Sequence, residues 1–419
     1  MYEPKEEQFV CAVCLGILQT KFLSGFVDKI SEEIRRKQYD STKISLSISV
    51  PSSVIMRQSY HWAHQGDVAA APELDDLFGV KDALRVILSR LIQDRGALSV
   101  DGNAEVKLSI DFEHEESMRE FEKLGLVPGK ARKDSRRAKW KRKMQNLDEE
   151  DFVPPPAPET EMRASVLRAL QKMSLTNLAK QFESLKSFQT APVIRVSAVA
   201  ESVFISGRYR KLSRELSQTP WIIDGDRKTE SSVQDEIVKN AIDWFKPYAG
   251  VKFQSAGRED SDVRMLGNGR DFLVEFCDPT CRRFDAQRLL ALEKAIKQGT
   301  TRVDVLDLRV IEGFDADVCA NNLKAGEESK RKLYRAVVWF EKPYTQKALD
   351  ELTPKEEVVV NQGTPIRVCH RRTLMYRRRS VHNLKFVSLN PHFAMIDLET
   401  QAGTYIKEFV HGDRVSVHQ

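Results

Sequence analysis

Cysteine and long apolar runs are both scarce in this chain. Six cysteines in 419 residues are too few for a disulfide framework, which excludes the small secreted scaffolds that depend on such bridges. No apolar run approaches the roughly 20 residues of a membrane span. The start, Met-Tyr-Glu-Pro-Lys-Glu-Glu, is not that of a secretory signal peptide. These absences predict an intracellular protein without a membrane segment, and we place it in the nucleus and cytoplasm.

The excess of positive charge is also small. A formal net charge of +5 does not by itself indicate nucleic acid, so local clusters of charge matter more than the total. A length of 419 residues suggests two or three domains, and a hydrophobic content of 41% is enough for sizeable cores.

Hydrophobic periodicity indicates an α+β fold. Apolar residues that alternate predict strands, and apolar residues that recur every three or four positions predict helices. In the first half this predicts helices over residues 22–34 and 80–92 and strands over 44–50 and 106–112. In the second half it predicts strands over 193–199, 203–205, 272–276, 303–310 and 332–340, with a helix over 285–299.

A strongly basic run lies between these halves. Residues 130–143 contain nine lysines and arginines, Trp140 and a single acid, Asp134. Such a run can follow phosphates, direct nuclear import or form a solvated linker, and all three interpretations stay open. An acidic patch and the proline cluster of residues 154–158 come next, so we predict a basic, proline-rich linker at 130–160.

Residues 255–270 are the most informative segment. They combine three glycines, three arginines and three acids with no helical or strand period, which predicts an ordered loop. Guanidinium groups match phosphate oxygens in pairs. A carboxylate among arginines stays ionised, as a nucleophile requires. A solvated surface loop with internal ion pairs is the alternative.

The string Gly257-Arg-Glu-Asp260 resembles the Gly-Arg-x-Asp loop of pseudouridine synthases, in which the Asp is the catalytic residue. The longer run through residue 270 is similar to one branch, the archaeal and eukaryotic tRNA pseudouridine(54/55) synthases of the "Pus ten" family. This resemblance assigns catalysis to Asp260 rather than to Asp262. It also implies that Arg258 and Arg264 bind the flipped nucleotide and its phosphate.

Three later segments extend the resemblance. Tyr334 matches the tyrosine that stacks on the target base, whose hydroxyl is often proposed as the base at C5; without that context a tyrosine here is core or rim. Residues 366–372 resemble a family His-Arg-Arg motif, with a solvated strand edge as the alternative. Residues 400–407 resemble a segment whose cation pairs with the catalytic carboxylate, which implies that role for Lys407.

Cys11 and Cys14 form a Cys-x-x-Cys pair, which can hold one side of a tetrahedral zinc site. No second such pair follows, and His61 and His64 are closer together than is usual in zinc sites. In the resembled family an earlier pair completes the site. We therefore expect half a zinc site here and structural zinc only in a longer form, with free thiols as the alternative. The chain is also expected to lack the family's last strand.

The resemblance implies an architecture. Residues 1–190 would form an accessory RNA-binding domain of the THUMP-containing kind. Residues 191–419 would form a pseudouridine synthase domain on a mixed, largely antiparallel sheet.

The implied function is isomerisation of uridine in the TΨC arm of tRNA, at position 55 with 54 as a second target. The enzyme would be a monomer with tRNA as its partner, and it would need no metal, nucleotide or redox cofactor for catalysis. One alternative is an inactive RNA-binding protein derived from such an enzyme, which the shortened ends favour. A methyltransferase is less favoured, because no glycine-rich cofactor loop follows a strand and opens a helix.

Overall fold

The computed structural model describes residues 10–65, 79–95, 98–118, 120, 185, 187–369 and 372–412. The chain divides into two compact units. The first comprises Met1–Glu201 with Asp278–Arg282, and the second Ser202–Cys277 with Arg283–Gln419. The first unit thus extends beyond the expected boundary at residue 190. The predicted linker at 130–160, with its basic run, lies outside the described residues.

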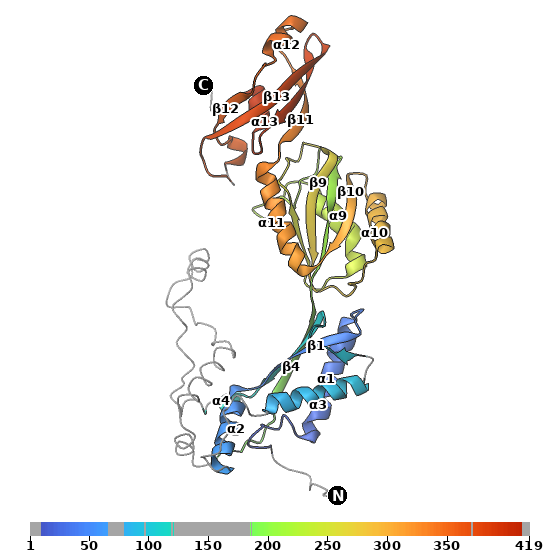
Figure 1. The fold of residues 1–419 in the computed structure, drawn as a ribbon, viewed down its shortest axis with the longest axis vertical. Coiled ribbons are helices and arrows are strands. Elements are labelled where there is room, and N and C mark those ends of the chain that lie inside the picture. The colour runs from blue at the N-terminus through green and yellow to red at the C-terminus, as the bar shows by residue number, and fades with distance from the viewer. Residues whose placement is uncertain are drawn as a thin grey trace. The chain divides into compact units, whose positions relative to one another are not determined.

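The first unit is built on a mixed four-stranded sheet (Figure 1). Its described elements are α1 (Thr20–Lys37), β1 (Lys43–Ser49), α2 (Ser52–Gln65), α3 (Val80–Arg95), β2 (Ser99–Val100), β3 (Val106–Glu113), α4 (Glu115–Met118) and β4 (Val193–Ala200). The strand order is β2-β1-β3-β4, with β1 parallel to β2 and β3 and only β4 antiparallel. The apolar stripes of α1 and α3 and the alternating residues of β1 and β3 share one core.

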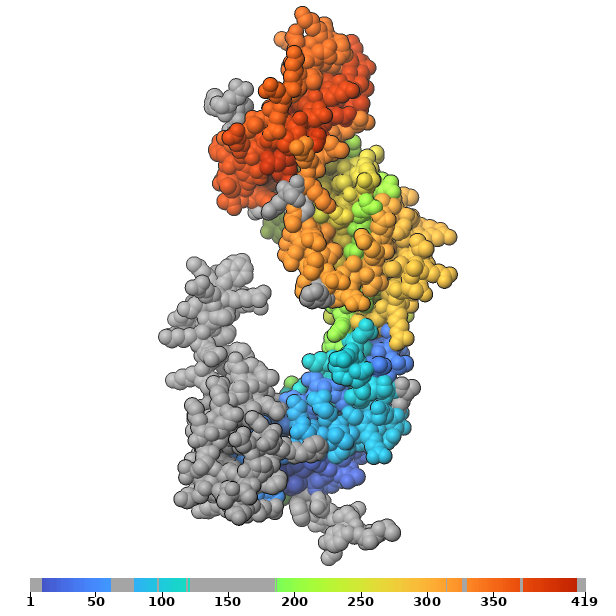
Figure 2. Space-filling model, viewed as in Figure 1, coloured from blue at the N-terminus to red at the C-terminus, as the bar shows by residue number. Residues whose placement is uncertain are grey.

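The second unit begins with an antiparallel sheet in the order β10-β5-β9-β8. Its elements are β5 (Val203–Lys211), β6 (Ile222–Ile223), β7 (Asp226–Arg227), α9 (Val233–Phe245), β8 (Val251–Ser255), β9 (Met265–Phe276), α10 (Ala286–Gly299) and β10 (Val303–Ile311). Side chains of Ser232 and Asp285 cap α9 and α10 by accepting from backbone amides of their first turns. In the space-filling view α10 and its neighbours form the yellow-to-orange surface of this unit (Figure 2).

A second antiparallel sheet, in the order β11-β14-β13-β12, follows in the same unit. Its elements are α11 (Gly313–Ser329), β11 (Lys332–Trp339), α12 (Gln346–Leu352), β12 (Val358–Gln362), the 3-10 helix η3 (Ile366–Val368), β13 (Arg377–Asn390), β14 (Phe393–Thr400) and α13 (Ile406–His411). It has its own core around Val381, Leu384, Ile396 and Leu398, against which α13 packs.

The α+β prediction is confirmed, and two details differ. The mixed sheet belongs to the first unit, whereas the second unit contains two purely antiparallel four-stranded sheets. Residues 265–270, predicted as loop, are the start of β9, because cross-strand pairing with β5 outweighs their glycine-rich composition. Gly267 and Gly269 take positive φ there, at +63° and +80°. No helix in the described parts of the chain is long and apolar enough to cross a membrane.

Candidate active site

The loop of residues 256–264 joins β8 to β9, and a buried lysine holds its backbone. The Nζ of Lys211, on β5, donates to the carbonyl oxygens of Asp260 at 2.8 Å, Ser261 at 2.9 Å and Leu216 at 2.8 Å. Lys211 has no exposed surface. Burial lowers the pKa of Lys211 to about 8, although the carboxylates of the loop act in the opposite direction.

Glu259 lies on the inner side of the loop, in a buried polar cluster. The hydroxyl of Tyr209 lies 2.9 Å from both carboxylate oxygens of Glu259, and Nε of Arg270 is 3.1 Å from one of them. Burial, and then the charge of Glu259, raise the pKa of Tyr209, so the phenol stays protonated and donates. Glu259 and Arg270 therefore neutralise each other beneath the loop.

Two more inward hydrogen bonds fix the first residues of the loop. Gln218 Nε2 donates to the carbonyl of Gly257 at 2.7 Å, and Nη1 of Arg270 donates to the carbonyl of Ala256 at 2.6 Å. Gly257 has φ of +89°, a conformation that side chains other than glycine rarely adopt. With these carbonyls and Glu259 turned inward, the side chain of Asp260 remains partly exposed, at 28%.

The second sheet supplies two cations to the carboxylate of Asp260. Nη1 of Arg367, in η3, is 2.6 Å from Oδ2 of Asp260. Nζ of Lys407, on α13, is 3.4 Å from the same oxygen. Two positive charges therefore lie within 3.4 Å of this carboxylate.

Lys407 makes its closer contacts with the other aspartate of the loop. Its Nζ is 2.7 Å from both carboxylate oxygens of Asp262. Burial opposes ionisation of Asp262, but the hydrogen bond and charge of Lys407 outweigh it and lower the pKa of Asp262. The expected contact between Lys407 and Asp260 is thus present, but at 3.4 Å it is longer than the 2.7 Å contact between Lys407 and Asp262.

The helical period of α13 explains how its charged residues reach the loop. Ile406, Phe409 and Val410 pack against the core of the second sheet. Lys407 and Glu408 therefore lie on the opposite face of the helix. Glu408 accepts two hydrogen bonds from Arg367, at 2.7 and 3.0 Å.

Tyr334 is the predicted base-stacking residue. It lies on β11 opposite Leu398 of β14, half-buried against the core of the second sheet. Burial raises the pKa of Tyr334, and the charge of Arg270 partly offsets this while that of Asp260 adds to it.

The two predicted phosphate ligands, Arg258 and Arg264, are exposed. Within the described ranges neither side chain makes a hydrogen bond or an ion pair, in contrast to Arg270, which is committed to the buried cluster. Both guanidinium groups are therefore free to meet a ligand in solution.

The predicted half zinc site lies at the start of the first unit. The neighbouring thiol of Cys11, together with burial, raises the pKa of Cys14. No group of three or more His, Cys, Asp or Glu side chains with metal-ligand geometry occurs among the described residues. The side chain of His64 lies outside them, and His61 does not join the pair. The described residues thus offer zinc two ligands of the four it usually takes.

Several residues of this site were not predicted individually, among them Arg367, Glu408 and Lys211. Arg367 falls within the segment 366–372 that resembles a family motif, and Glu408 directly follows Lys407. The sequence therefore indicated the segments that contain both residues, but not the residues themselves. Lys211 follows Gly207-Arg-Tyr-Arg in a basic segment, and nothing in that segment indicates which cation is buried.

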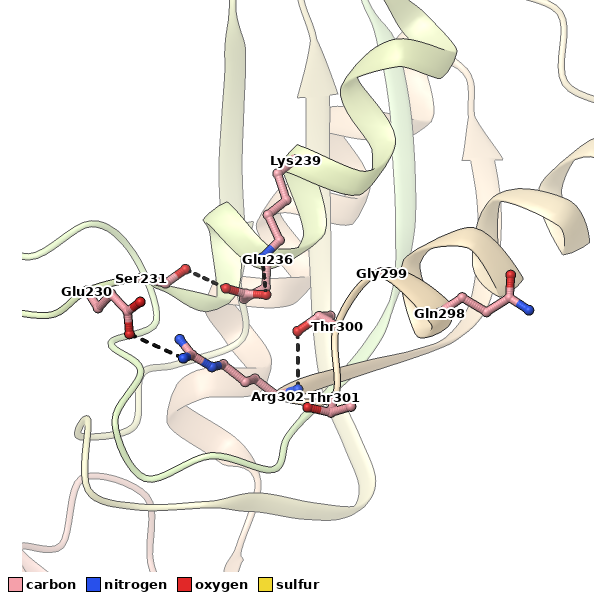
Figure 3. Close-up of a pocket in the computed structure, with 9 residues that line it drawn as sticks. All are labelled: Glu230, Ser231, Glu236, Lys239, Gln298, Gly299, Thr300, Thr301 and Arg302. Carbon is pink, nitrogen blue, oxygen red and sulfur yellow. Dashed lines mark hydrogen bonds and ion pairs between the residues drawn. The ribbon is translucent and has the colours of Figure 1, made fainter.

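A polar hollow of about 490 Å³ lies elsewhere in the second unit, between the start of α9 and the end of α10 (Figure 3). Its charged groups are already paired, Arg302 with Glu230 at 3.2 Å and Lys239 with Glu236 at 2.6 Å. It contains none of the predicted site residues. We therefore locate the candidate active site at the 256–264 loop.

Two family matches cover nearly all of the described chain. "Eukaryotic Pus10, N-terminal" matches residues 11–196, and "Pus10, C-terminal" matches residues 204–416, which include the whole loop and both of its cations. The chain belongs to the Pus10 family. Its N-terminal part is of the eukaryotic type.

Relatives of the Pus10 family carry the name tRNA pseudouridine synthase Pus10. The one from Mus musculus is 34% identical and covers 99% of this chain and 75% of its own length. The one from Homo sapiens is 33% identical over 96% of this chain and 73% of its own length. That from the archaeon Thermofilum pendens is 39% identical over 50% of this chain and 46% of its own length. The Pus10 family is thus one of RNA-modifying isomerases.

A solved structure titled "Crystal Structure of a Cbf5-Nop10-Gar1 Complex" was also matched. Its TM-score is 0.27, with 13% identity over 49% of this chain and 42% of the matched chain. A similarity this low carries no argument about the fold or the site.

Proposed function

We propose that this chain isomerises uridine to pseudouridine in the TΨC arm of tRNA, at position 55 with 54 as a second target, and that Asp260 is the catalytic residue. Membership of the Pus10 family supports the reaction. The observation that carries the residue assignment is the partly exposed carboxylate of Asp260, on a loop anchored from beneath, with two cations within 3.4 Å.

The reaction balances without a cofactor. The bond between N1 of uracil and C1′ of the ribose breaks, and a bond between C5 and C1′ forms. C5 loses a proton and N1 gains one, so nothing is oxidised or reduced. Asp260 acts either as the nucleophile or as the base that removes a ribose proton, and in both roles its carboxylate lies beside the positive charges of Arg367 and Lys407.

Tyr334 stacks on the target base in this proposal. Its raised pKa keeps the phenol protonated at neutral pH, which fits stacking better than proton abstraction at C5. Arg258 and Arg264 hold the phosphates of the flipped nucleotide, because both are exposed and unpaired in the described part of the chain.

The first unit acts as the THUMP-containing RNA-binding domain and holds the acceptor end of the tRNA. The enzyme works as a monomer in the nucleus and cytoplasm. Cys11 and Cys14 contribute to a structural zinc site only where further ligands join them.

The test uses the full chain with an unmodified tRNA transcript, followed by carbodiimide treatment and primer extension. We expect a stop in the TΨC arm. Transcripts with cytidine at position 54 or at position 55 show which uridine produces it. A folded chain that binds the transcript but leaves no stop would refute the proposal and point to an inactive RNA-binding relative.

A further inference from the structure

The distances around Asp260 distinguish its two cations. Arg367 is 2.6 Å from Oδ2, the length of a charge-assisted hydrogen bond, whereas Lys407 is 3.4 Å away. Lys407 instead lies 2.7 Å from each oxygen of Asp262. Arg367 is therefore the nearer cation of Asp260, and Lys407 is shared between two carboxylates.

Glu408 determines where the guanidinium of Arg367 points. It accepts from Nε at 2.7 Å and from Nη2 at 3.0 Å, which occupies one edge of the planar group. Nη1 is on the other side and donates to Asp260. Because the five N–H donors of arginine have fixed directions, fixing one edge also fixes Nη1. A lysine ammonium has no such second edge.

Local packing holds both partners of this pair. Glu408 is only 9% exposed, and its neighbours Ile406, Phe409 and Val410 attach α13 to the core of the second sheet. Val368, next to Arg367, is buried. The contact with Glu408 raises the pKa of Arg367, so the charge is permanent. The pair is thus in place before any substrate arrives.

We propose that Arg367 is the positioning residue for the carboxylate of Asp260, that Glu408 aims it, and that Lys407 acts chiefly by neutralising Asp262. This inference rests on the proposed function and refines it. Arg367 holds Oδ2 in place, and the lysine prevents the second aspartate of the loop from repelling the first.

The test compares Arg367→Met with Arg335→Met. Arg335, on β11, makes an equally close two-pronged pair with Asp397, at 2.6 and 2.8 Å, with no contact to the 256–264 loop. Single-turnover rates with saturating enzyme and tRNA dissociation constants are measured for both. We expect Arg367→Met to slow the chemical step by about 100-fold, as removal of a preorganised charged donor does, with tRNA affinity within about threefold of wild type. Arg335→Met should change neither.

Two further variants separate positioning from folding. Arg367→Lys keeps the charge but cannot serve Glu408 and Asp260 in the same geometry, so we expect a rate between those of wild type and Arg367→Met. Glu408→Gln should slow the step by about tenfold. The double variant Arg367→Met/Glu408→Gln should be no slower than Arg367→Met alone. Each change removes the same contact between Arg367 and Asp260, so their effects should not add.

The outcomes separate this inference from the proposed function. Wild-type rates in Arg367→Met, beside an inactive Asp260→Asn, would overturn the inference and leave the function standing. A loss confined to tRNA affinity would also overturn it, by making Arg367 a phosphate ligand. An inactive wild type would overturn both.

Discussion

The two sheets of the second unit hold the 256–264 loop by different means. The first sheet holds the loop's backbone and its buried Glu259. Lys211 and Arg270 donate to carbonyl oxygens, and Tyr209 and Arg270 contact the carboxylate of Glu259. Helices next to the second sheet reach the side chains of Asp260 and Asp262. Their cations, Arg367 and Lys407, are about one-third exposed. One set fixes where the loop runs, and the other orients the carboxylates of Asp260 and Asp262.

This difference has an energetic consequence. When a buried carbonyl loses its hydrogen-bond donor, the folded state is destabilised by the desolvation penalty of that carbonyl, about 1–3 kcal/mol. A partly exposed ion pair contributes about 1 kcal/mol or less to folding. Changes on the first side should therefore reduce both stability and catalysis, whereas changes on the second should reduce catalysis alone.

The largest effect is expected for Lys211→Met. Three carbonyls lose their shared donor, so we expect the free energy of unfolding to fall by about 3 kcal/mol and the single-turnover rate by more than about 100-fold. Chemical denaturation and single-turnover assays measure the two. Lys252→Met is the matched control, because Lys252 is 65% exposed and pairs at the surface with Glu275, away from the 256–264 loop. A Lys211→Met protein with the wild-type rate would contradict the anchoring role.

A smaller loss of the single-turnover rate is expected for substitutions of Tyr334, where stacking and base catalysis predict different results. If the ring stacks, Tyr334→Phe keeps the rate within about threefold of wild type, and Tyr334→Ala loses about 10- to 100-fold because the aromatic face is gone. Single-turnover rates of both variants at pH 7 distinguish stacking from base catalysis. A Phe variant as slow as the Ala variant would show that the hydroxyl itself is required.

The burial of Lys211 also predicts a pH dependence of stability. Its folded pKa, about 8, lies below the roughly 10.4 of an unfolded lysine. Between these values the unfolded chain binds more protons, so the Lys211 contribution to the free energy of unfolding rises with pH. Four charged groups face Lys211, namely Glu259, Asp260, Asp262 and Arg270. They are present in both proteins, so the comparison of wild type with Lys211→Met isolates the contribution of Lys211. We expect the stability difference between wild type and this variant to widen from pH 8 to 10. A constant difference would contradict the assignment.

The smallest effect is expected for Arg258→Gln and Arg264→Gln. Both side chains are exposed and unpaired among the described residues, so stability should not change. Removing one phosphate-binding cation should weaken tRNA binding a few-fold and make it less dependent on salt. Filter binding at several salt concentrations tests this. An unchanged salt dependence in both variants would show that Arg258 and Arg264 do not bind the phosphates of the tRNA.

The sequence predicted the parts of this site that short-range patterns encode. The alternating strands and the helix capped by Asp285 follow from periodicity and local hydrogen bonding, and their positions are confirmed. The Asp260 loop and Lys407 were found through family-like strings, and the structure places them together.

Contacts between distant segments could not be predicted in the same way. Arg367 and Asp260 are 107 residues apart, and Lys211 and Asp260 are 49 apart. No pattern within either segment specifies its partner. The strand character of residues 265–270 was missed for the same reason, since it depends on pairing with β5.

The most direct measurement is pseudouridine mapping of a tRNA transcript after incubation with wild type, Asp260→Asn and Asp262→Asn. The two substitutions are chemically identical and lie two residues apart on the same loop. We predict a stop in the TΨC arm with wild type, a weaker stop with Asp262→Asn and none with Asp260→Asn. A stop that persists in Asp260→Asn and disappears in Asp262→Asn would contradict the assignment of catalysis to Asp260.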